Sequence, residues 1–362
     1  MSELIVPVVQ IRDVKPHPNA DRLEIVVIDG WEIVSGKGNY IAGDLAVHVP
    51  PESMVPKEYA DKWGVTPYLS FKGEGLAGRV KAARLRGTVS FGFLAPAPPG
   101  SKVGTDLREV WGIEKYEPPE RNLGAGQMSS EDPLFFRYTN IGNLRNEVSA
   151  FDPEMIYTVT EKIHGTNSRV GWIRRATGEE GSGDELTPMV GTHRTQLEVD
   201  KAGLYGLPLR KYGKELNAFR DIILRTLADA GTNISEVNSI IVYGEIYGPG
   251  VQDMHYGLDS QTKDYRVFDV SINGHYIAFG RMAFLAMQAG LEIVPILFTG
   301  ELTLDRVFAY ADGNTTMNDA EQIREGIVIR PFSEEKPHRN GRHIFKVISG
   351  AYLSRKGGTE NH

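Results

Sequence analysis

Short apolar runs separated by turn residues occupy the first hundred positions of the chain. The strands they predict are residues 4–11, 22–28, 31–34 and 46–49. Asp29-Gly30, between the second and third of these runs, is typical of a tight β-hairpin. Many short strands at this spacing predict a small β-barrel, and the proline-rich residues 95–100 form a natural end for it.

A second pattern, of longer strands mixed with helices, follows a polar stretch that contains adjacent prolines. The predicted strands are residues 155–160, 168–173, 240–247, 265–272, 276–280, 326–330 and 344–348, and the predicted helices are residues 215–230 and 281–289. Leu216, Phe219 and Ile223 give the first helix one apolar face. Asn273-Gly274 predicts a tight hairpin between two of the strands. This half of the chain is therefore expected to be an α+β unit.

These shifts in pattern divide the chain. The expected parts are a barrel over residues 1–106, a linker over 107–132, an α+β domain over 133–353 and a tail over 354–362 that frays.

Composition and charge narrow the class of protein. The chain has 362 residues, of which 41% are hydrophobic and 24% charged, as expected for a folded protein. The absence of cysteine excludes disulfides, Cys-ligated zinc and a thiol nucleophile. The N-terminus carries no signal-peptide pattern and no apolar run is long enough to span a membrane, so we expect a soluble protein of the cytoplasm or another intracellular compartment.

The net charge of −7 is unlike that of a protein that merely coats nucleic acid, but one stretch is basic. Arg79, Lys81, Arg84 and Arg86 fall in a segment with a single acidic residue. They predict an RNA-binding surface. A solvated face of a strand pair explains the same charges equally well.

A glycine pattern in the same stretch, Gly73-x-Gly75-x-x-Gly78, fits a dinucleotide-binding or kinase loop only superficially. No acidic residue stands about 20 positions later to hold a ribose, and the other kinase motifs are missing. Turn glycines are the simpler interpretation.

The segment with the strongest chemical signal is Thr160-Glu-Lys-Ile-His-Gly-Thr-Asn167, where a strand ends and the chain turns at a glycine. A lysine that is buried or flanked by cations loses its proton more readily and can act as an amine nucleophile. By itself, Lys162 at a strand end would more often be a surface charge.

Later strands carry residues that change this estimate. They are Glu245, Phe268, Glu325 and Lys346, each on a predicted strand or at its edge. Carboxylates hold Mg²⁺, lysines bind phosphate and an aromatic ring stacks on a base. The set could line one nucleotide pocket.

In this order the motifs resemble those of the covalent nucleotidyltransferases, specifically the ATP-dependent RNA ligases. Glu161-Lys-Ile-His-Gly-Thr-Asn167 is similar to the RNA ligase form of the nucleophile motif, whereas DNA ligases and capping enzymes generally have Asp at the position of His164. The resemblance covers residues 135–350. His17-Pro-Asn-Ala-Asp-Arg-Leu-Glu24 is similar to the opening of OB-type tRNA-binding domains, and an OB domain placed first is the arrangement of the RNA ligase family 5 type.

The resemblance implies an α+β fold, in which an N-terminal OB-like β-barrel precedes an ATP-grasp-like nucleotidyltransferase domain of antiparallel sheets with flanking helices. It implies ATP, with AMP carried covalently on Lys162, and Mg²⁺ or Mn²⁺ as cofactors. The implied substrate is RNA with 3′-hydroxyl and 5′-phosphate ends, in a nicked duplex or a structured RNA. The protein itself is expected to be a monomer that does not bind a membrane.

Residue roles follow from the same resemblance. The expected catalytic residues are Lys162, Lys346, Glu325 and His164; the expected nucleotide contacts are Glu161, Asn167, Arg194, Glu245, Phe268 and Lys346; the expected metal ligands are Glu325 and Glu245. Within this set, Lys346 should hold the α-phosphate, Phe268 should stack on adenine and His164 should orient the pyrophosphate side. Arg169 and Arg210 are rivals for the place of Arg194.

One departure concerns the closing motif, which in many relatives has two lysines separated by one residue. Here Ile344 and Ile348 stand on either side of Lys346, so the second cation is missing or is replaced by Arg355 or Lys356. Two other functions stay open: a catalytically silent RNA-binding protein on the same fold, and a DNA ligase or guanylyltransferase.

Overall fold

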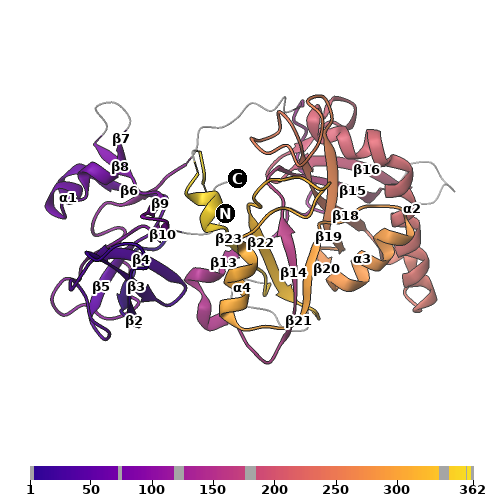
Figure 1. The fold of residues 1–362 in the computed structure, drawn as a ribbon. Coiled ribbons are helices and arrows are strands. Elements are labelled where there is room, and N and C mark those ends of the chain that lie inside the picture. The colour runs from indigo at the N-terminus through magenta and orange to yellow at the C-terminus, as the bar shows by residue number, and fades with distance from the viewer. Residues whose placement is uncertain are drawn as a thin grey trace.

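The computed structural model describes residues 4–71, 76–117, 126–175, 185–333, 342–355 and 357–359. It forms an N-terminal β unit and a larger α+β unit that lie side by side, with the C-terminal segment (yellow) between them (Figure 1). The predicted class, α+β with mostly antiparallel sheets, is confirmed. Among the helices of these ranges, none is long and apolar enough to cross a membrane.

The N-terminal unit is built from short antiparallel strands. Its elements are β1 (Val8–Gln10), β2 (Asp13–Pro16), β3 (Leu23–Ile28), β4 (Trp31–Gly36), β5 (Leu45–Val49), β6 (Ser53–Pro56), α1 (Lys57–Lys62), β7 (Ser70–Phe71), β8 (Ala77–Arg79), β9 (Ala82–Leu85), β10 (Thr88–Phe91), β11 (Phe93–Pro96) and β12 (Glu114–Lys115). Strands β2, β3 and β4 form one sheet, and β1, β5 and β11 form another. The predicted hairpin at Asp29-Gly30 joins β3 to β4, where Ile28 pairs with Trp31.

The chain that follows β11 does not leave this unit where the sequence predicted a linker. Leu107, Trp111 and Ile113 are buried in the same apolar cluster as Val47 and Val49, and β12 pairs with β6. The burial of three large apolar side chains explains why residues 107–115 stay attached. Residues 118–125 of the expected linker lie outside the described residues, and the other domain bounds stay predictions.

Two sheets form the larger unit. Their strands are β13 (Gly142–Asn143), β14 (Ile156–Lys162), β15 (Thr166–Arg175), β16 (Glu185–Thr192), β17 (Gln196–Leu197), β18 (Ser239–Tyr247), β19 (Asp264–Ile272), β20 (His275–Tyr276), β21 (Ile296–Glu301), β22 (Gly326–Pro331) and β23 (Phe345–Ile348). The first sheet has the order β13-β23-β22-β14-β21 and the second β17-β16-β15-β18-β19-β20. Strand β14 lies between β22 and β21 in the first sheet, and the next strand along the chain, β15, belongs to the second sheet.

Three helices pack against these sheets, α2 (Leu207–Asp229), α3 (Phe279–Gln288) and α4 (Leu304–Ala311). The short helix α5 (Gly350–Leu353) instead contacts β9 and β10 of the N-terminal unit. The predicted apolar face of α2 is confirmed, but α2 begins earlier than predicted, with Pro208 in its first turn, where proline is tolerated. The predicted strand over residues 276–280 is wrong beyond Tyr276, because α3 already begins at Phe279.

The hairpin between β19 and β20 has the predicted geometry. Asn273 and Gly274 adopt φ angles of 51° and 79°, and both central residues of a tight type I′ turn require positive φ.

Arg145 joins the two units. It lies in a short 3₁₀ turn (Leu144–Asn146) of the larger unit, and its guanidinium donates a hydrogen bond of 2.7 Å to the carbonyl of Gly30. The guanidinium also lies 4.7 Å from the ring centre of Phe91 and 4.5 Å from that of Phe308. A side chain at Gly30 would come within 2.5 Å of the Arg145 carbonyl, so the close approach requires glycine.

Candidate active site

A cavity of about 770 Å³ is lined by both sheets of the larger unit and by part of the N-terminal unit. The predicted site residues that line it are Glu161, Lys162, Asn167, Arg194, Glu245, Phe268, Lys346 and Arg79. Its size is within the range of small-molecule sites. The sequence predicted that one pocket is shared by Lys162, Glu245, Phe268, Glu325 and Lys346. Four of these five residues line this cavity, and Glu325 does not.

Lys162 is the last residue of β14, and its Nζ lies 2.7 Å from Oε1 of Glu325. Backbone pairing sets this contact, because Lys162 lies opposite Gly326 in the antiparallel β14–β22 pair. Glu325 is completely buried beneath the lysine and does not line the cavity. The ion pair holds the Nζ of Lys162 against this carboxylate, so the lysine must leave Glu325 before its Nζ can attack a ligand in the cavity.

The turn after Lys162 carries the chain from one sheet to the other. At Gly165 a side chain would lie 2.1 Å from the carbonyl oxygen of Ile246, which leaves room for glycine alone. A loop encloses the turn, since Gln252 donates to the carbonyl of Gly165 at 3.3 Å and the backbone N–H of His164 donates to the Tyr256 hydroxyl at 2.6 Å. The position of the nucleophile candidate is therefore fixed from two sides.

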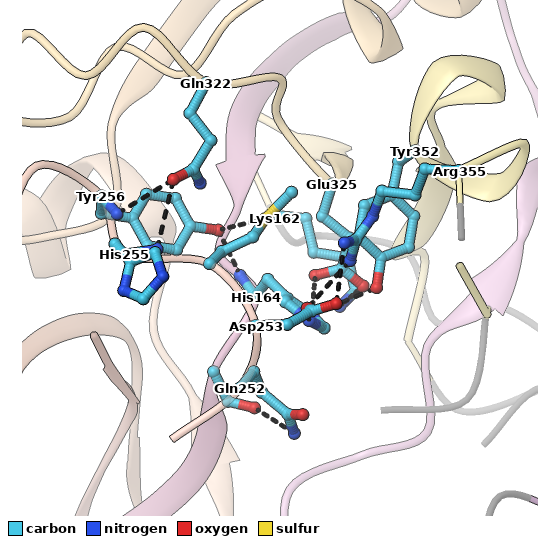
Figure 2. A network of polar contacts seen from close by, with 12 residues as sticks. Lys162, His164, Gln252, Asp253, His255, Tyr256, Gln322, Glu325, Tyr352 and Arg355 are labelled. Atoms are coloured by element: carbon cyan, nitrogen blue, oxygen red, sulfur yellow. Dashed lines mark hydrogen bonds and ion pairs between the residues drawn. The ribbon is translucent and has the colours of Figure 1, made fainter. Parts of the chain in front are cut away.

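His164 points away from the cavity, into a network of polar contacts (Figure 2). Its Nε2 lies 2.7 Å from Oδ1 of Asp253, while its Nδ1 lies 3.3 Å from the Tyr352 hydroxyl and 3.7 Å from Oε2 of Glu325. Burial alone would lower the pKa of His164, but its interactions with Asp253 and Glu325 outweigh burial and raise that pKa. The sequence predicted that His164 orients the pyrophosphate side of ATP. In the structure its side chain does not lie on the cavity surface.

Asn167 and Glu245 lie opposite each other on β15 and β18, facing the cavity. Burial raises the pKa of Glu245 to about 8, against the attraction of Lys162. The Oδ1 of Asn167 is buried and accepts no hydrogen bond from any part of the chain that the structure describes. Both side chains are poised to gain a polar partner from a ligand.

The sequence offered three arginines for one nucleotide contact, Arg194, Arg169 and Arg210, and they differ in their position relative to the cavity. Arg194 follows β16 and lines the cavity. Arg169 is buried and donates to the carbonyls of Thr192 and Phe135, and Arg210 donates to the carbonyl of Gly203; neither lines the cavity. Arg194 is the arginine of the three that a ligand in the cavity can reach.

Phe268 and Lys346 reach the cavity from β19 and β23. The ring of Phe268 is half-buried and packs edge-on against Tyr138, with 4.9 Å between ring centres. Lys346 is 8% exposed and pairs with Val328 in the first sheet. An aromatic face and a sheltered ammonium thus border the same space.

The Glu161 carboxylate supports the structure around the site. It accepts hydrogen bonds from the Thr315 hydroxyl at 2.5 Å and from the Thr316 N–H at 2.9 Å, which anchors that loop to β14. The Glu161 N–H donates to the carbonyl of Pro295 at 2.9 Å. The nucleotide contact expected of Glu161 would therefore fall to its backbone carbonyl, because its carboxylate and N–H are engaged.

The four basic residues predicted to bind RNA do not share one environment. Lys81, Arg84 and Arg86 are exposed on and around the β9–β10 hairpin. Arg79 instead pairs with Glu52 at 2.7 Å and stacks on Tyr116, with 3.7 Å to the ring centre. It is a wall of the cavity rather than part of the exposed patch.

The His17-Pro-Asn19 motif holds that hairpin in place. The imidazole of His17 lies 3.2 Å from the carbonyl of Leu85, and the side-chain amide of Asn19 donates to the carbonyl of Arg86 at 3.1 Å. The motif therefore orients the exposed basic residues.

Asp253 and Tyr256 were missed from the sequence. They lie in an irregular loop without a recognisable spacing, and only the fold brings them to His164. Within the described ranges, no group of three or more His, Cys, Asp or Glu side chains is arranged to hold a metal ion. Lys356, one candidate for the second closing-motif cation, lies outside the described residues, while Arg355 contacts Asp253 at 2.8 and 3.0 Å.

Comparisons with known proteins agree with this architecture. A family model described as RNA ligase matches residues 155–348, and an OB-fold domain model matches residues 5–97. A search of curated protein sequences returned no match.

Solved structures of the Naegleria gruberi RNA ligase are similar over the whole chain. A lysine-to-alanine mutant with ATP and Mn gives a TM-score of 0.73 at 23% identity, covering 98% of this chain and 100% of that one. A glutamate-to-alanine mutant with AMP and Mn gives 0.72 at 23%, covering 99% and 100%, and the ligase with PPi gives 0.69 at 25%, covering 97% and 98%. These similarities support the fold. The RNA ligase family model matches more than half of the length of this chain, so the chain belongs to the RNA ligase family.

Proposed function

We propose that the protein is an ATP-dependent RNA ligase that joins 3′-hydroxyl and 5′-phosphate ends through AMP bound to Lys162. The observation that carries this proposal is the place of Lys162, at a strand end on the wall of a nucleotide-sized cavity that Glu245 and Lys346 share. Membership of the RNA ligase family and the ATP, AMP and Mn named for the similar ligase structures support it.

The reaction has three steps. The neutral Nζ of Lys162 attacks the α-phosphorus of ATP, so that a P–N bond forms, the nitrogen loses one proton and pyrophosphate leaves with the electrons of the broken P–O bond. An oxygen of the RNA 5′-phosphate then attacks this AMP phosphorus, the P–N bond breaks and the amine regains a proton. Finally, the 3′-hydroxyl attacks the activated 5′-phosphorus and loses its proton, and AMP leaves.

The lining residues suit these substrates. We assign Lys346 to the α-phosphate and Phe268 to the adenine ring, because an ammonium pairs with phosphate and an aromatic face stacks on a base. Asn167, Glu245 and Arg194 are assigned to the ribose and its surroundings. The Glu161 carbonyl is assigned to the edge of adenine.

A divalent ion fits the acidic residues. Mg²⁺ is typically held by one or two carboxylates together with substrate phosphates and water, and Glu245 and Glu325 would hold it here. When bound, such an ion neutralises charge on the phosphates. Glu325 lies beneath Lys162, so the lysine has to move from it before the carboxylate can face a ligand, directly or through water.

RNA ends are the substrate that the rest of the chain favours. The exposed Lys81, Arg84 and Arg86 offer cations for a phosphate backbone, and a nicked duplex or a structured RNA would place its ends at the cavity. We assign these residues to RNA binding, and we expect the protein to act as a monomer.

Self-labelling tests the proposal. The purified protein is stripped of bound AMP and incubated with α-labelled ATP and Mg²⁺, beside Lys162→Ala and a control, Lys214→Ala, which alters an exposed lysine of α2. We expect label that survives denaturation in the parent and in Lys214→Ala, and none in Lys162→Ala. A parent without label would refute the proposal and favour a silent RNA-binding protein. Label from GTP would favour a guanylyltransferase, and equal sealing of DNA nicks a DNA ligase.

A further inference from the structure

The contacts of His164 continue beyond the active site. Asp253, which accepts from His164 Nε2 at 2.7 Å, is itself held by both terminal nitrogens of Arg355 at 2.8 and 3.0 Å (Figure 2). The hydrogen bonds of His164 and Arg355 hold the pKa of Asp253 well below its usual range. A carboxylate bound on both sides in this way has one orientation, and so does the imidazole that it contacts.

Arg355 is in turn fixed by its packing. Its guanidinium lies 4.2 Å from the ring centre of Tyr352, the residue whose hydroxyl lies 3.3 Å from His164 Nδ1. Asp253 and Tyr352 therefore both contact the buried imidazole of His164, and Arg355 contacts both of these residues. None of the three lines the cavity, so whatever they do for a reaction there they do through His164 and the turn that bears Lys162.

The chain beyond Arg355 reaches the N-terminal unit, although the sequence predicted a frayed tail. The Thr359 hydroxyl donates to Glu52 at 3.2 Å, and Arg79 donates to the carbonyl of Gly358 at 3.1 Å. Thr359 is 4% exposed, and a side chain at Gly358 would lie 2.4 Å from the carbonyl oxygen of Tyr352. The C-terminal segment, meaning Arg355 and residues 357–359, thus contacts both units.

We propose that Asp253 and Arg355 are positioning residues for adenylylation, and that the C-terminal segment couples them to the N-terminal unit. Asp253 fixes the imidazole of His164, and this ring fixes the turn between Lys162 and Gly165 together with the second oxygen of Glu325. Docking of Thr359 and Gly358 on Glu52 and Arg79 keeps Arg355 on Asp253. The inference rests on the proposed function, because it assigns these residues to the step in which Lys162 attacks ATP.

Variants of the full-length protein test it in three assays. The assays are the rate of label transfer from α-labelled ATP over a range of ATP concentrations, the sealing of RNA that carries a pre-adenylylated 5′ end, and the thermal midpoint of unfolding. Arg355→Gln removes the charge, Arg355→Lys restores it, and Thr359→Val removes one contact with the N-terminal unit. Arg281→Gln, at an exposed arginine of α3, is the matched control.

We expect Arg355→Gln to slow labelling at saturating ATP about tenfold, since a charge-assisted contact is lost. The ATP concentration for half-maximal rate, the sealing of pre-adenylylated RNA and the thermal midpoint should stay close to those of the parent. Arg355→Lys should recover most of the rate, and Thr359→Val should lose about threefold.

Two results would overturn the inference while leaving the ligase proposal intact. One is labelling by Arg355→Gln at the rate of the parent and of Arg281→Gln. The other is an equal fall in labelling, sealing and thermal midpoint, which would mean that Arg355 only supports the fold. Absence of label in the parent would instead refute the proposed function itself.

Discussion

The Nζ of Lys162 lies 2.7 Å from Oε1 of Glu325, a residue 163 positions further along the chain. The contact joins the end of β14 to the start of β22, and Glu325 is fully buried there. Two functions of this carboxylate have opposite consequences. If it only holds Lys162 in the ion pair, its neutralisation would free the lysine and speed adenylylation. If it also helps to hold the divalent ion, its neutralisation would slow adenylylation.

We expect Glu325→Gln to slow label transfer from ATP by about 100-fold, because the reaction needs the charge of the carboxylate as well as its shape. The measurement is the initial rate of labelling at saturating ATP and Mg²⁺. Glu301→Gln, at an exposed position at the end of β21, is the control and should label like the parent. Faster labelling by Glu325→Gln would show that the ion pair is only inhibitory.

Glu245 should govern the requirement for a divalent ion. Because burial raises its pKa to about 8, the carboxyl is mostly protonated at neutral pH and a cation has to displace this proton. Glu245→Gln keeps the shape and cannot ionise. We expect the Mg²⁺ concentration for half-maximal labelling to rise about tenfold. An unchanged Mg²⁺ titration would place the ion elsewhere.

The sequence predicted the class of fold and several of the residues that line the cavity. Lys162, Glu245, Phe268 and Lys346 were found because each follows or lies within a strand whose apolar pattern is clear, and the structure places all four on one cavity. The role of each stays a prediction.

What the sequence missed depends on contacts between distant segments. Nothing near Asp253 marks it as a partner of His164, since the two residues are 89 positions apart and only the loop geometry joins them. Arg79 has the same charge as its exposed neighbours, yet Glu52 and Tyr116 hold it in the cavity wall. The polar composition of the tail predicted fraying, because the sequence does not reveal that Thr359 has a buried partner.

His48 should make the N-terminal unit sensitive to acid. Burial lowers the pKa of His48 to about 4, and its Nε2 lies 2.8 Å from the carbonyl of Phe91. Between about pH 6.5 and pH 4 the unfolded chain therefore binds a proton that the folded one does not, so stability falls as the pH falls through this window. From pH 7 to pH 5 the loss from this group is about 2 kcal/mol.

The test of this acid sensitivity is His48→Gln, which keeps a side-chain donor and cannot titrate. Denaturant unfolding at pH 7 and pH 5 should show a smaller loss of stability for the variant than for the parent. His275→Gln, at an exposed histidine, should behave like the parent. Equal losses in His48→Gln and the parent would refute the assignment.

Arg145 should hold the two units together. Arg145→Ala removes the hydrogen bond to Gly30 and the packing of the guanidinium between Phe91 and Phe308. We expect the free energy of unfolding to fall by about 3 kcal/mol and the two units to unfold in separate transitions. Calorimetry would detect this, and a single transition at the parent temperature would show that other contacts suffice. Arg281→Ala is the control.

The exposed basic residues around the β9–β10 hairpin should act on RNA and not on ATP. The double variant Lys81→Ala/Arg84→Ala is expected to weaken binding of nicked RNA about tenfold. It should also reduce the slope of log affinity against log salt by about 1 to 2, because the variant makes fewer phosphate contacts and its binding therefore releases fewer counterions. Labelling by ATP should be unchanged, since neither residue lines the cavity. Lys57→Ala/Lys102→Ala removes two exposed lysines of the same unit and should leave both RNA binding and its salt slope unchanged. If the two double variants behave alike, these charges only solvate the surface, and RNA must be held by another face of the molecule.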